Sequence, residues 1–324
     1  MQLVNTYREE FLNHQKKFTN FNEPKNLYDP IKYILELGGK RLRPILTLMT
    51  TDVFGGSYKD ALDASLAIEV FHNFSLVHDD IMDKAPLRRG KATVHEKWDA
   101  NAGVLSGDTM LILAYQLFEN YEGKTFKALI NLFSTTGVQV CEGQQYDMDF
   151  EVINDVSIDE YLKMIEYKTA VLVAAAMKMG AIVAGAATVD QDAIYEFGRN
   201  LGIAFQLQDD YLDAFGDAEM FGKQVGGDII ENKKTYLYIK ALDFSSKEDT
   251  SKLRELYSGS LSNNDKKIET VKAIFNKSGA TQATQDAIAT YTKSAFSILD
   301  TINLEADKIE ILKTFGTNLM NRKM

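Results

Sequence analysis

Two acidic clusters have the residue types and the spacing that metal-assisted chemistry needs. Residues 78–83 read HDDIMD and residues 208–213 read QDDYLD, so each cluster contains the pattern DDxxD. On a helix, residues four apart lie one turn above each other, and the first and last aspartates of each cluster would share a face. Like charges this close repel one another unless a cation compensates them, and Mg²⁺ prefers hard oxygen ligands together with substrate phosphates. We therefore predict that both clusters hold metal ions and, through them, a diphosphate.

Basic residues flank both clusters and favour phosphate chemistry over simple metal storage. Residues 38–44 read GGKRLRP, which offers Lys40, Arg41 and Arg43 after a flexible glycine pair. Further basic residues follow each cluster or lie between the two: Arg88, Arg89, Lys168, Lys223 and Lys233. Six aspartates and one diphosphate would carry roughly −9 charges, against roughly +6 from three Mg²⁺ ions, so a few of these side chains would balance the site. Each is an ordinary surface charge when taken alone, but together they indicate a binding site.

The bulk composition excludes several other classes of protein. The 324 residues carry a formal net charge of −10, which argues against electrostatic binding to nucleic acid or to anionic lipid. Cys141 is the only cysteine, so the chain can form neither an intramolecular disulfide nor a cysteine zinc site, and we interpret this residue as a packing residue. A reducing compartment fits this cysteine usage, and the N-terminus does not resemble a signal peptide. We therefore expect a cytoplasmic protein.

Long helices are the elements that must position the two clusters. The prolines lie at positions 24, 30, 44 and 86, so no proline can interrupt a helix after residue 86. Apolar residues recur at steps of three and four within residues 63–80, which run into the first cluster, and within residues 198–216, which contain the second. Runs of strict alternation are scarce. The predicted fold class is all-α, in a single domain over residues 1–324.

Polar stretches are expected to connect these helices. We predict three loops and one surface excursion, at residues 21–31, 84–93, 216–234 and 243–267. The apolar segment at residues 169–187 carries Lys178 at its middle and is rich in Ala and Gly. Such a segment suits close helix packing, so we interpret it as a buried helix rather than a membrane span.

The motifs, in this order, resemble those of the trans-isoprenyl diphosphate synthases, which form the polyprenyl synthetase family. The matching motifs run along nearly the whole chain: GGKRLRP at 38–44, DDIMD at 79–83 followed by LRRG, GQQYD at 143–147, KT at 168–169, FQLQDDYLD at 205–213 and GKQVGGDIIENKKT at 222–235. The resemblance implies a bundle of long helices around a deep central cavity, a homodimer, and Mg²⁺-dependent prenyl transfer. It also implies the substrates, isopentenyl diphosphate and an allylic diphosphate (dimethylallyl, geranyl or farnesyl). Neither a nucleic-acid partner nor a transmembrane segment is expected.

The resemblance also implies roles for individual residues. The ligands implied for three Mg²⁺ ions are Asp79, Asp83 and Asp209, with Asp80, Asp210 and Asp213 in support. The residues implied for the allylic diphosphate are Arg88, Lys168 and Lys223, with Lys233 close by. The residues implied for isopentenyl diphosphate are Lys40, Arg43, His72 and Arg89. Two residues are implied to face the developing carbocation, Thr169 and Gln206. Together with Lys168 they are the implied catalytic residues.

Residues one or two turns before the first cluster are expected to form the floor of the product cavity. These are Phe71, Phe74 and Ser75, which lie eight, five and four residues before Asp79. In the family that this chain resembles, a single aromatic residue five positions before the first cluster is typical of enzymes that make C20 products. Aromatic residues at both the fourth and the fifth positions are typical of enzymes that make C15 products. We predict C20 geranylgeranyl diphosphate, with C15 farnesyl diphosphate next. Packing of Phe74 between helices, without a role in product length, is the alternative.

Other functions remain open from the sequence. A terpene cyclase of the same fold would share the first cluster, although DDYLD is the synthase pattern at the second, and a synthase of longer polyprenyl diphosphates would share both. A regulatory subunit would have lost one cluster, and a plain Mg²⁺- or Ca²⁺-binding protein would not need the basic residues. The pair His78–Asp79 also occurs in helical metal phosphohydrolases, but these need more metal-ligand histidines than His14, His72 and His95 supply. We interpret His78 as a helix-packing residue or as a support for the metal ligands.

Overall fold

The computed structural model describes residues 2–216, 225–259 and 263–321. Two compact units are present, Met1–Thr136 with Ala175–Tyr195 (unit 1) and Gly137–Ala174 with Glu196–Met324 (unit 2). Within the described ranges nearly every element is a helix, and the strands have two residues each. The predicted all-α fold is confirmed. The predicted single domain stays a prediction, and each unit is described here by itself.

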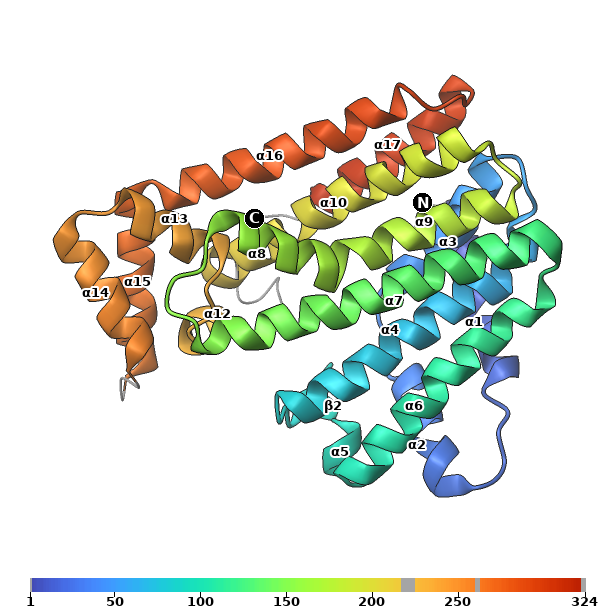
Figure 1. Ribbon diagram of the computed structural model, residues 1–324, viewed down its shortest axis with the longest axis horizontal. Coiled ribbons are helices and arrows are strands. Elements are labelled where there is room, and N and C mark those ends of the chain that lie inside the picture. The colour runs from blue at the N-terminus through green and yellow to red at the C-terminus, as the bar shows by residue number, and fades with distance from the viewer. Residues whose placement is uncertain (1, 217–224, 260–262, 322–324) are drawn as a thin grey trace. The chain divides into compact units, whose positions relative to one another are not determined.

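Unit 1 is built from helices and one small hairpin (Figure 1). Its helices are α1 (Gln2–Phe18), α2 (Lys25–Glu36), α3 (Leu42–Val53), the 3-10 helix η1 (Tyr58–Ala61), α4 (Leu62–Met82), α5 (Val94–Lys97), α6 (Ala100–Gln116) and the 3-10 helix η2 (Leu117–Asn120). The hairpin pairs β1 (Leu87–Arg88) with β2 (Lys91–Ala92) in antiparallel orientation. Three further helices have residues in both units: α7 (Gly123–Val152), α9 (Val171–Val183) and α10 (Thr188–Phe215).

Helix α4 lies in the core of unit 1 and carries the first acidic cluster at its end. The periodic apolar residues Leu66, Val70, Phe74 and Val77 are all buried, as their spacing predicts. The helix packs against α3 and α6, and it runs beside α6 in Figure 1. Each large apolar side chain buried in this way stabilises the fold by about 1.5–3 kcal/mol relative to exposure in water. The cluster is therefore attached to one of the most firmly packed helices of the unit.

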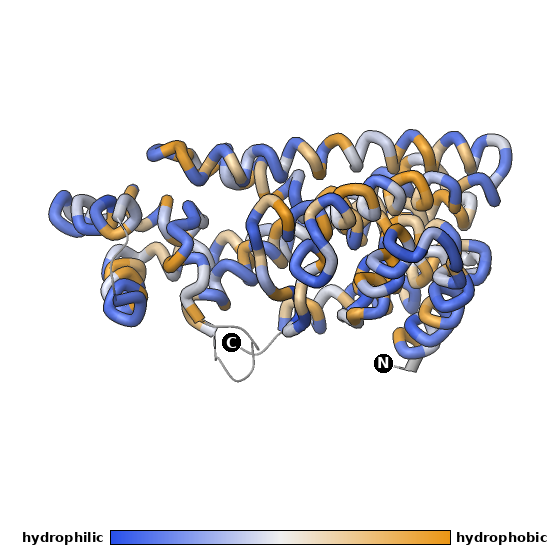
Figure 2. Tube along the Cα trace, turned by 90° about the horizontal axis from the view of Figure 1, so that it is seen from below, coloured by the Kyte–Doolittle hydropathy of each residue, from blue (hydrophilic) through white to orange (hydrophobic). Residues whose placement is uncertain are grey.

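Unit 2 is helical throughout its described residues. Besides its parts of α7, α9 and α10, its helices are α8 (Ile158–Ile165), the π-helical turn η3 (Glu166–Ala170), α12 (Gly227–Ile230), α13 (Tyr236–Phe244), α14 (Lys247–Ser258), α15 (Asn264–Ser278), α16 (Ala280–Leu299) and α17 (Ala306–Met320). One hydrophobic core joins α8, α10, α13 and α15 and includes Tyr161, Leu207, Leu237 and Val271. Figure 2 shows both hydrophilic and hydrophobic residues within each turn of most helices, as is expected for amphipathic helices.

Several predicted loops are more ordered than the sequence indicates. Helix α2 begins at Lys25, inside the loop predicted at 21–31, because Ile31, Ile34 and Leu35 supply a buried apolar face. The loop predicted at 84–93 contains the β1–β2 hairpin. Within the loop predicted at 216–234, α12 is helical, and residues 217–224 lie outside the described residues.

The polar stretch at residues 243–267, predicted as a surface excursion, is mostly exposed, but much of it is helical. Helix α14 occupies Lys247–Ser258, and the first residues of α15 follow from Asn264. Although α14 is polar overall, Leu253 and Leu256 lie on one face and are buried. Two apolar residues three apart are a weak periodic signal, and tertiary packing decides such a case.

The apolar segment at residues 169–187 forms a buried helix, as predicted. Helix α9 spans Val171–Val183, and a Cβ added at Gly180 would lie 2.3 Å from the Thr47 carbonyl oxygen, so α9 approaches α3 at backbone distance. Lys178 extends to the edge of the helix, where its Nζ binds Asp192 Oδ1 at 2.5 Å. None of the helices in the described ranges combines the length and the apolar character that crossing a membrane requires.

Candidate active site

The first acidic cluster lies at the C-terminal end of α4. The helix ends at Met82, and the Asp83 N–H donates to the Asp79 carbonyl at 2.8 Å, so these two aspartates lie one turn apart as predicted. The Asp80 side chain is 1% exposed, and it accepts hydrogen bonds from Arg88 of β1. Nε lies 2.9 Å from both carboxylate oxygens and Nη2 lies 2.6 Å from Oδ1. This bidentate pair holds the hairpin against the end of α4.

The turn of the hairpin brings Arg89 to the glycine pair of GGKRLRP. Arg89 and Gly90 have φ values of 54° and 74°, the left-handed conformation of a tight two-residue turn. The Arg89 guanidinium donates to the Gly38 carbonyl, and a Cβ added at Gly39 would come 3.0 Å from its Cζ atom. Gly39 also has φ +127°, so this position needs glycine for its backbone and for its contact. Two segments that the sequence predicts to bind the same substrate are therefore in direct contact.

A basic cluster forms around His72 on α4. Burial lowers the pKa of the imidazole well below its ordinary value, and the charges of Arg43 and Arg89 lower it further. Burial also lowers the pKa of Arg43, to about 10, and the pKa of Arg89, while both guanidinium groups remain charged near neutral pH. His72 is therefore a neutral imidazole among cations. Guanidinium donors with an imidazole N–H among them suit an anion such as a diphosphate.

Aromatic side chains surround the predicted chain-length residues. Phe71 and Phe74 are 2% and 8% exposed, and their ring centroids lie 5.4 Å apart. Phe71 also contacts Phe133 of α7 edge-on at 5.2 Å. Ser75 donates its hydroxyl hydrogen to the His72 carbonyl at 2.9 Å. The aromatic rings pack closely around this part of α4, which suits a floor for the product, and their role in product length stays a prediction.

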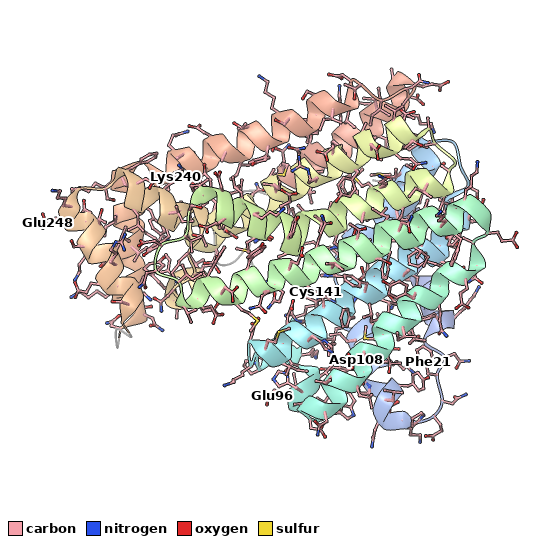
Figure 3. The ribbon with its side chains drawn as sticks, viewed as in Figure 1. Phe21, Glu96, Asp108, Cys141, Lys240 and Glu248 are labelled. Atoms are coloured by element: carbon pink, nitrogen blue, oxygen red, sulfur yellow. The ribbon has the colours of Figure 1, made fainter. Side chains whose placement is uncertain are left out.

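The two residues interpreted as packing residues have different outcomes. His78 packs between α4 and α6, because its Nε2 lies 3.2 Å from the Val104 carbonyl oxygen and 2.2 Å from where a Cβ on Gly107 would stand. The packing interpretation of His78 is confirmed. The interpretation of Cys141 is wrong, since its side chain is exposed on α7 (Figure 3), one turn after Val138, which is 60% exposed.

The second acidic cluster lies near the end of α10, and its middle residue is again turned into the protein. Asp210 accepts hydrogen bonds from the Tyr161 hydroxyl at 2.5 Å and from Gln206 Nε2 at 2.8 Å. Burial raises the pKa of Asp210, whereas the two hydrogen bonds act in the opposite direction. Asp213 Oδ2 accepts from the Asp228 N–H at 2.9 Å, which ties the cluster to α12.

A π-helical turn presents the two predicted catalytic residues of the KT motif. Lys168 and Thr169 lie within η3, where backbone hydrogen bonds join residues five apart instead of the four of an α-helix. A Cβ at Gly143 would stand 2.3 Å from the Lys168 N atom, and a Cβ at Gly202 would stand 2.7 Å from the Ala170 Cα atom. Two glycines therefore let α7 and α10 approach the turn at backbone distance.

The side chains of the π-helical turn are paired with neighbouring helices. Lys168 Nζ lies 2.6 Å from Asp147 Oδ2. The Thr169 hydroxyl donates to Gln206 Oε1 at 3.0 Å, and Gln206 in turn donates to Asp210. The structure thus brings together Thr169, Gln206 and Asp210 in one hydrogen-bonded chain, and it brings Lys168 to the last residue of GQQYD.

A further acidic and basic pair follows the second cluster. Burial raises the pKa of Asp228, and the charges of Asp210 and Asp213 raise it further. Burial lowers the pKa of Lys233, but the neighbouring carboxylates Asp228 and Asp147 outweigh it, and the net direction is upward. Lys233 keeps 44% of its side chain exposed and is charged near neutral pH. The other lysine predicted in this region, Lys223, lies outside the described residues.

The donor set of the two clusters fits Mg²⁺. In the described ranges, no group of three or more His, Cys, Asp or Glu side chains is arranged to hold a metal ion. Mg²⁺ normally takes only one or two protein carboxylates and completes its shell with substrate phosphates and water. The residues that the motifs assign to the ion are Asp79, Asp83 and Asp209, with Asp213 beside them, while Asp80 and Asp210 are bound by Arg88 and by Tyr161. The clusters belong to different units, so their meeting around one diphosphate stays a prediction.

Sequence reasoning missed four residues that organise the candidate site. These are Glu69, Asp147, Tyr161 and Asp228. Asp147 and Asp228 lie inside the motifs GQQYD and GGDIIENKK, so the motifs contained the signal although no role was assigned. Glu69 and Tyr161 look like ordinary helix residues in the sequence, and only their burial beside charged partners distinguishes them.

Comparisons with known proteins agree with these motifs. The model of the polyprenyl synthetase family matches residues 24–277. The short chain isoprenyl diphosphate synthase of Methanothermobacter thermautotrophicus is 36% identical over 301 residues, which cover 93% of this chain and 91% of the relative. The geranylgeranyl diphosphate synthase of Methanosarcina mazei is 41% identical over 228 residues, which cover 70% of each chain.

Solved structures give the same picture. A crystal structure of a geranylgeranyl pyrophosphate synthase superimposes with a TM-score of 0.95 at 52% sequence identity, and the match covers 99% of each chain. At this identity the likeness concerns the sequence as well as the fold.

Proposed function

Because the chain belongs to the polyprenyl synthetase family and is a trans-prenyltransferase, we propose that it condenses isopentenyl diphosphate with an allylic diphosphate and makes C20 geranylgeranyl diphosphate. The observation that carries this proposal is a basic cluster beside the first acidic cluster, formed by Arg43, Arg89 and the neutral His72. A prenyl diphosphate synthase must bind two diphosphates, one at its acidic clusters and one elsewhere. A terpene cyclase or a metal-storage protein needs no second anion site.

In this proposal, the acidic clusters bind the allylic diphosphate. Asp79, Asp83 and Asp209 would hold Mg²⁺, and the bound ion would supply Lewis-acid stabilisation of the charge on the departing diphosphate. Arg88, Lys168 and Lys233 add positive charge for the same oxygens. Asp80 and Asp210 fix the end of α4 and of α10 through Arg88 and Tyr161, so that their neighbours keep the productive geometry.

Thr169 of the π-helical turn and Gln206 of α10 act on the allylic carbon. When the C–O bond breaks, positive charge develops on that carbon, and the oxygen dipoles of Thr169 and Gln206 stabilise it. The double bond of isopentenyl diphosphate, held by Arg43, His72, Arg89 and Lys40, then attacks the carbocation, which leaves the positive charge on the tertiary carbon of the isopentenyl unit. The carbon next to this cation loses a proton to the departed diphosphate, and a new allylic double bond forms. Apolar side chains such as Phe74 exclude water, which would otherwise capture the cation.

A product assay tests the proposal. Labelled isopentenyl diphosphate is incubated with Mg²⁺ and, in separate reactions, dimethylallyl, geranyl or farnesyl diphosphate. Extension of the allylic diphosphate to C20 is the expected outcome. A hydrocarbon product would instead identify a terpene cyclase, a longer product would identify a longer-chain synthase, and no product from any primer would overturn the proposal.

The C20 assignment is supported by relatives and by α4. The Methanosarcina mazei relative and the superimposed crystal structure are both named geranylgeranyl synthases. Phe74 is an aromatic residue at the fifth position before Asp79, and Ser75 at the fourth is small. The homodimer and the cytoplasmic location remain predictions, and light scattering behind size-exclusion chromatography measures the first of them.

A further inference from the structure

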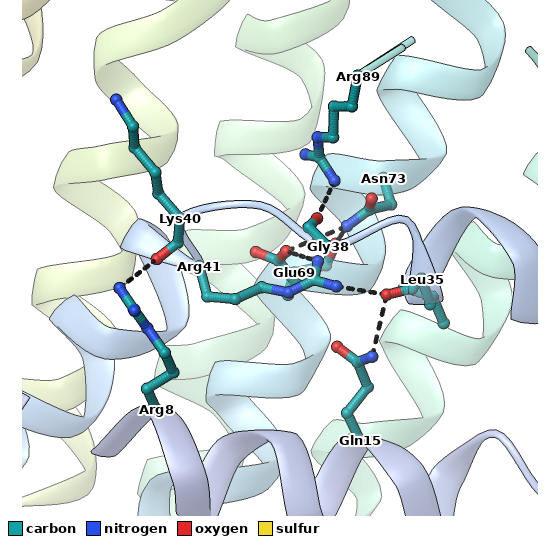
Figure 4. A network of polar contacts seen from close by, with 9 residues as sticks. All are labelled: Arg8, Gln15, Leu35, Gly38, Lys40, Arg41, Glu69, Asn73 and Arg89. Carbon is teal, nitrogen blue, oxygen red and sulfur yellow. Dashed lines mark hydrogen bonds and ion pairs between the residues drawn. The ribbon is translucent and has the colours of Figure 1, made fainter. Parts of the chain in front are cut away.

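Arg41 differs from the other basic residues of GGKRLRP because its side chain is enclosed in unit 1. The side chain is 3% exposed, and its Nη1 lies 2.5 Å from Glu69 Oε1. Its Nη2 donates to the Leu35 carbonyl. The backbone of Arg41 is left-handed, with φ 51°. This conformation turns the Arg41 side chain inward, while the preceding Lys40 side chain extends away from it (Figure 4).

The carboxylate of Glu69, the partner of Arg41, is also buried. Glu69 is likewise 3% exposed in its side chain, and it lies on α4 one turn before His72 and Asn73. Asn73 Nδ2 donates to the Glu69 carbonyl at 2.8 Å and to its Oε1 at 3.3 Å. The carboxylate therefore receives donors from Arg41 and from Asn73, and it belongs to the same helix face as the imidazole of the basic site.

Other side chains fasten the same segment. Gln15 donates to the Leu35 carbonyl at 3.1 Å, and Arg8 donates to the Lys40 carbonyl at 3.4 Å. Arg89 donates to the Gly38 carbonyl (Figure 4). The segment from Leu35 to Arg41 is thus held to α1, α4 and the hairpin by side chains that bind its backbone. Arg43 follows directly at the start of α3.

A gain in folding stability does not account for a buried ion pair of this kind. Desolvation of two charges offsets most of their attraction, and well-packed apolar residues of similar volume often serve equally well. Its geometry, however, links the backbone before Lys40 and Arg43 to the helix that carries His72. Because both terminal nitrogens of Arg41 bind acceptors within the protein, Arg41 is not available as a diphosphate ligand.

We propose that Arg41 and Glu69 are a positioning pair that sets the affinity for the isopentenyl diphosphate substrate, by fixing the GGKRLRP segment to α4 beside His72. This inference rests on the proposed function. It assigns no contact with substrate to either residue. It predicts that loss of the pair weakens the binding of isopentenyl diphosphate and leaves the binding of the allylic diphosphate unchanged.

The decisive variant is Arg41→Met with Glu69→Met, because it removes the pair without changing the net charge. We expect the KM for isopentenyl diphosphate to rise about tenfold or more, the effect of losing charge-assisted hydrogen bonds that hold the site. The KM for the allylic diphosphate and kcat at saturating isopentenyl diphosphate should stay within about twofold to threefold. An unchanged KM for isopentenyl diphosphate in the folded variant would overturn the proposal.

Glu69→Gln separates positioning from electrostatics and serves if the double variant does not fold. Removal of one negative charge beside an anion site should by itself tighten the binding of a diphosphate. Loss of positioning should weaken it. A higher KM for isopentenyl diphosphate therefore supports the positioning pair, and an equal or lower KM contradicts it.

Tyr7→Phe is the matched control. It removes a hydrogen bond of 2.5 Å from the Tyr7 hydroxyl to Asp52 within the same unit, between α1 and α3, without touching the Leu35–Arg41 segment. Both KM values should stay at those of the wild type, whatever the loss of thermal stability. If Tyr7→Phe raises the KM for isopentenyl diphosphate as much as the double variant does, the effect is general loosening and the proposal is wrong. If the wild type itself makes no elongated product, the proposed function fails instead.

Discussion

The guanidinium of Arg88 binds both carboxylate oxygens of Asp80, at distances of 2.6–2.9 Å, and so ties the hairpin to the end of α4. Asp210 has the same position in the second DDxxD, and it is held by Tyr161 and Gln206. The second aspartate of each cluster therefore has a structural contact, and its predicted support of the metal ligands stays a prediction. The outer aspartates of the first cluster, Asp79 and Asp83, remain the pair whose spacing suits metal ligation.

The first prediction separates these two kinds of aspartate. Asp79→Asn should reduce turnover by about two orders of magnitude or more at saturating Mg²⁺, and it should lower stability less than Asp80→Asn because Asp79 is only half-buried. Asp80→Asn should reduce both turnover and stability, the latter by about 2 kcal/mol, because Arg88 loses its charged partner. Thermal unfolding and steady-state kinetics measure the two effects. Glu36→Ala, at the exposed end of α2, is the control that should change neither.

The second prediction concerns product length. Phe74→Ala removes the aromatic ring that lies against Phe71 and His78. We expect the product to lengthen by at least one five-carbon unit, since the space left by the ring can admit one. Chromatography of the dephosphorylated alcohols gives the chain length. A variant that folds but still stops at the wild-type product would show that Phe74 only packs between helices.

The third prediction concerns the π-helical turn. Gly143→Ala would place a methyl group where only 2.3 Å separates it from the Lys168 N atom, so α7 and the turn must move apart. We expect a loss of about 1–3 kcal/mol in stability and a fall in kcat of at least about tenfold, because Lys168 and Thr169 shift together.

The control for this variant is Gly259→Ala, where the added Cβ meets an ordinary contact of 3.8 Å with the Glu255 carbonyl oxygen. Gly259 belongs to the same unit and lies at the end of α14. Its activity should equal that of the wild type. Wild-type activity in Gly143→Ala as well would mean that the close approach has no catalytic consequence.

The fourth prediction is a dependence of stability on pH. The pKa of His72 is lowered on folding by burial first, and then by Arg43, Arg89, Arg88 and Arg41, none of which titrates near neutral pH. The unfolded chain therefore binds a proton at His72 before the folded chain does. Stability is fully present above the unfolded pKa of about 6.5 and falls as the pH decreases below it.

His72→Gln removes this group and tests the sign. Between about pH 7 and pH 5, the melting temperature of the wild type should fall more steeply than that of the variant. Equal slopes in the two proteins would show that His72 titrates normally. The variant should also raise the KM for isopentenyl diphosphate, because the proposed site loses an imidazole donor.

Most of the helical framework follows from local patterns in the sequence. The spacing of Leu66, Val70 and Phe74 predicted α4, and the small residues around Gly180 predicted a closely packed α9. Both features depend on residues within a few turns of each other. The position of each acidic cluster at the end of its helix followed from the same periodicity.

The sequence does not show which residues of a motif face the site and which bind other parts of the protein. Arg41 and Arg43 are two positions apart in one basic motif, yet Arg41 is committed to Glu69, which lies 28 residues away in the chain. Tyr161 and Asp210 are 49 residues apart. Contacts at such separations are set by helix packing, which no local pattern encodes. The π-helical turn at residues 166–170 likewise lies against Gly143 and Gly202, which are distant from it in the sequence.

The π-helical turn has a consequence for the register of everything that precedes and follows it. One additional residue in a helix rotates the remainder by about 100° relative to an uninterrupted α-helix. Deletion of a single residue within Glu166–Ala170 would therefore restore regular helical winding, and it would swing α8, with Tyr161, away from the side on which it meets Asp210. The additional residue in the turn thus sets which side of α8 faces α10, independently of the orientation of α9, which follows the turn.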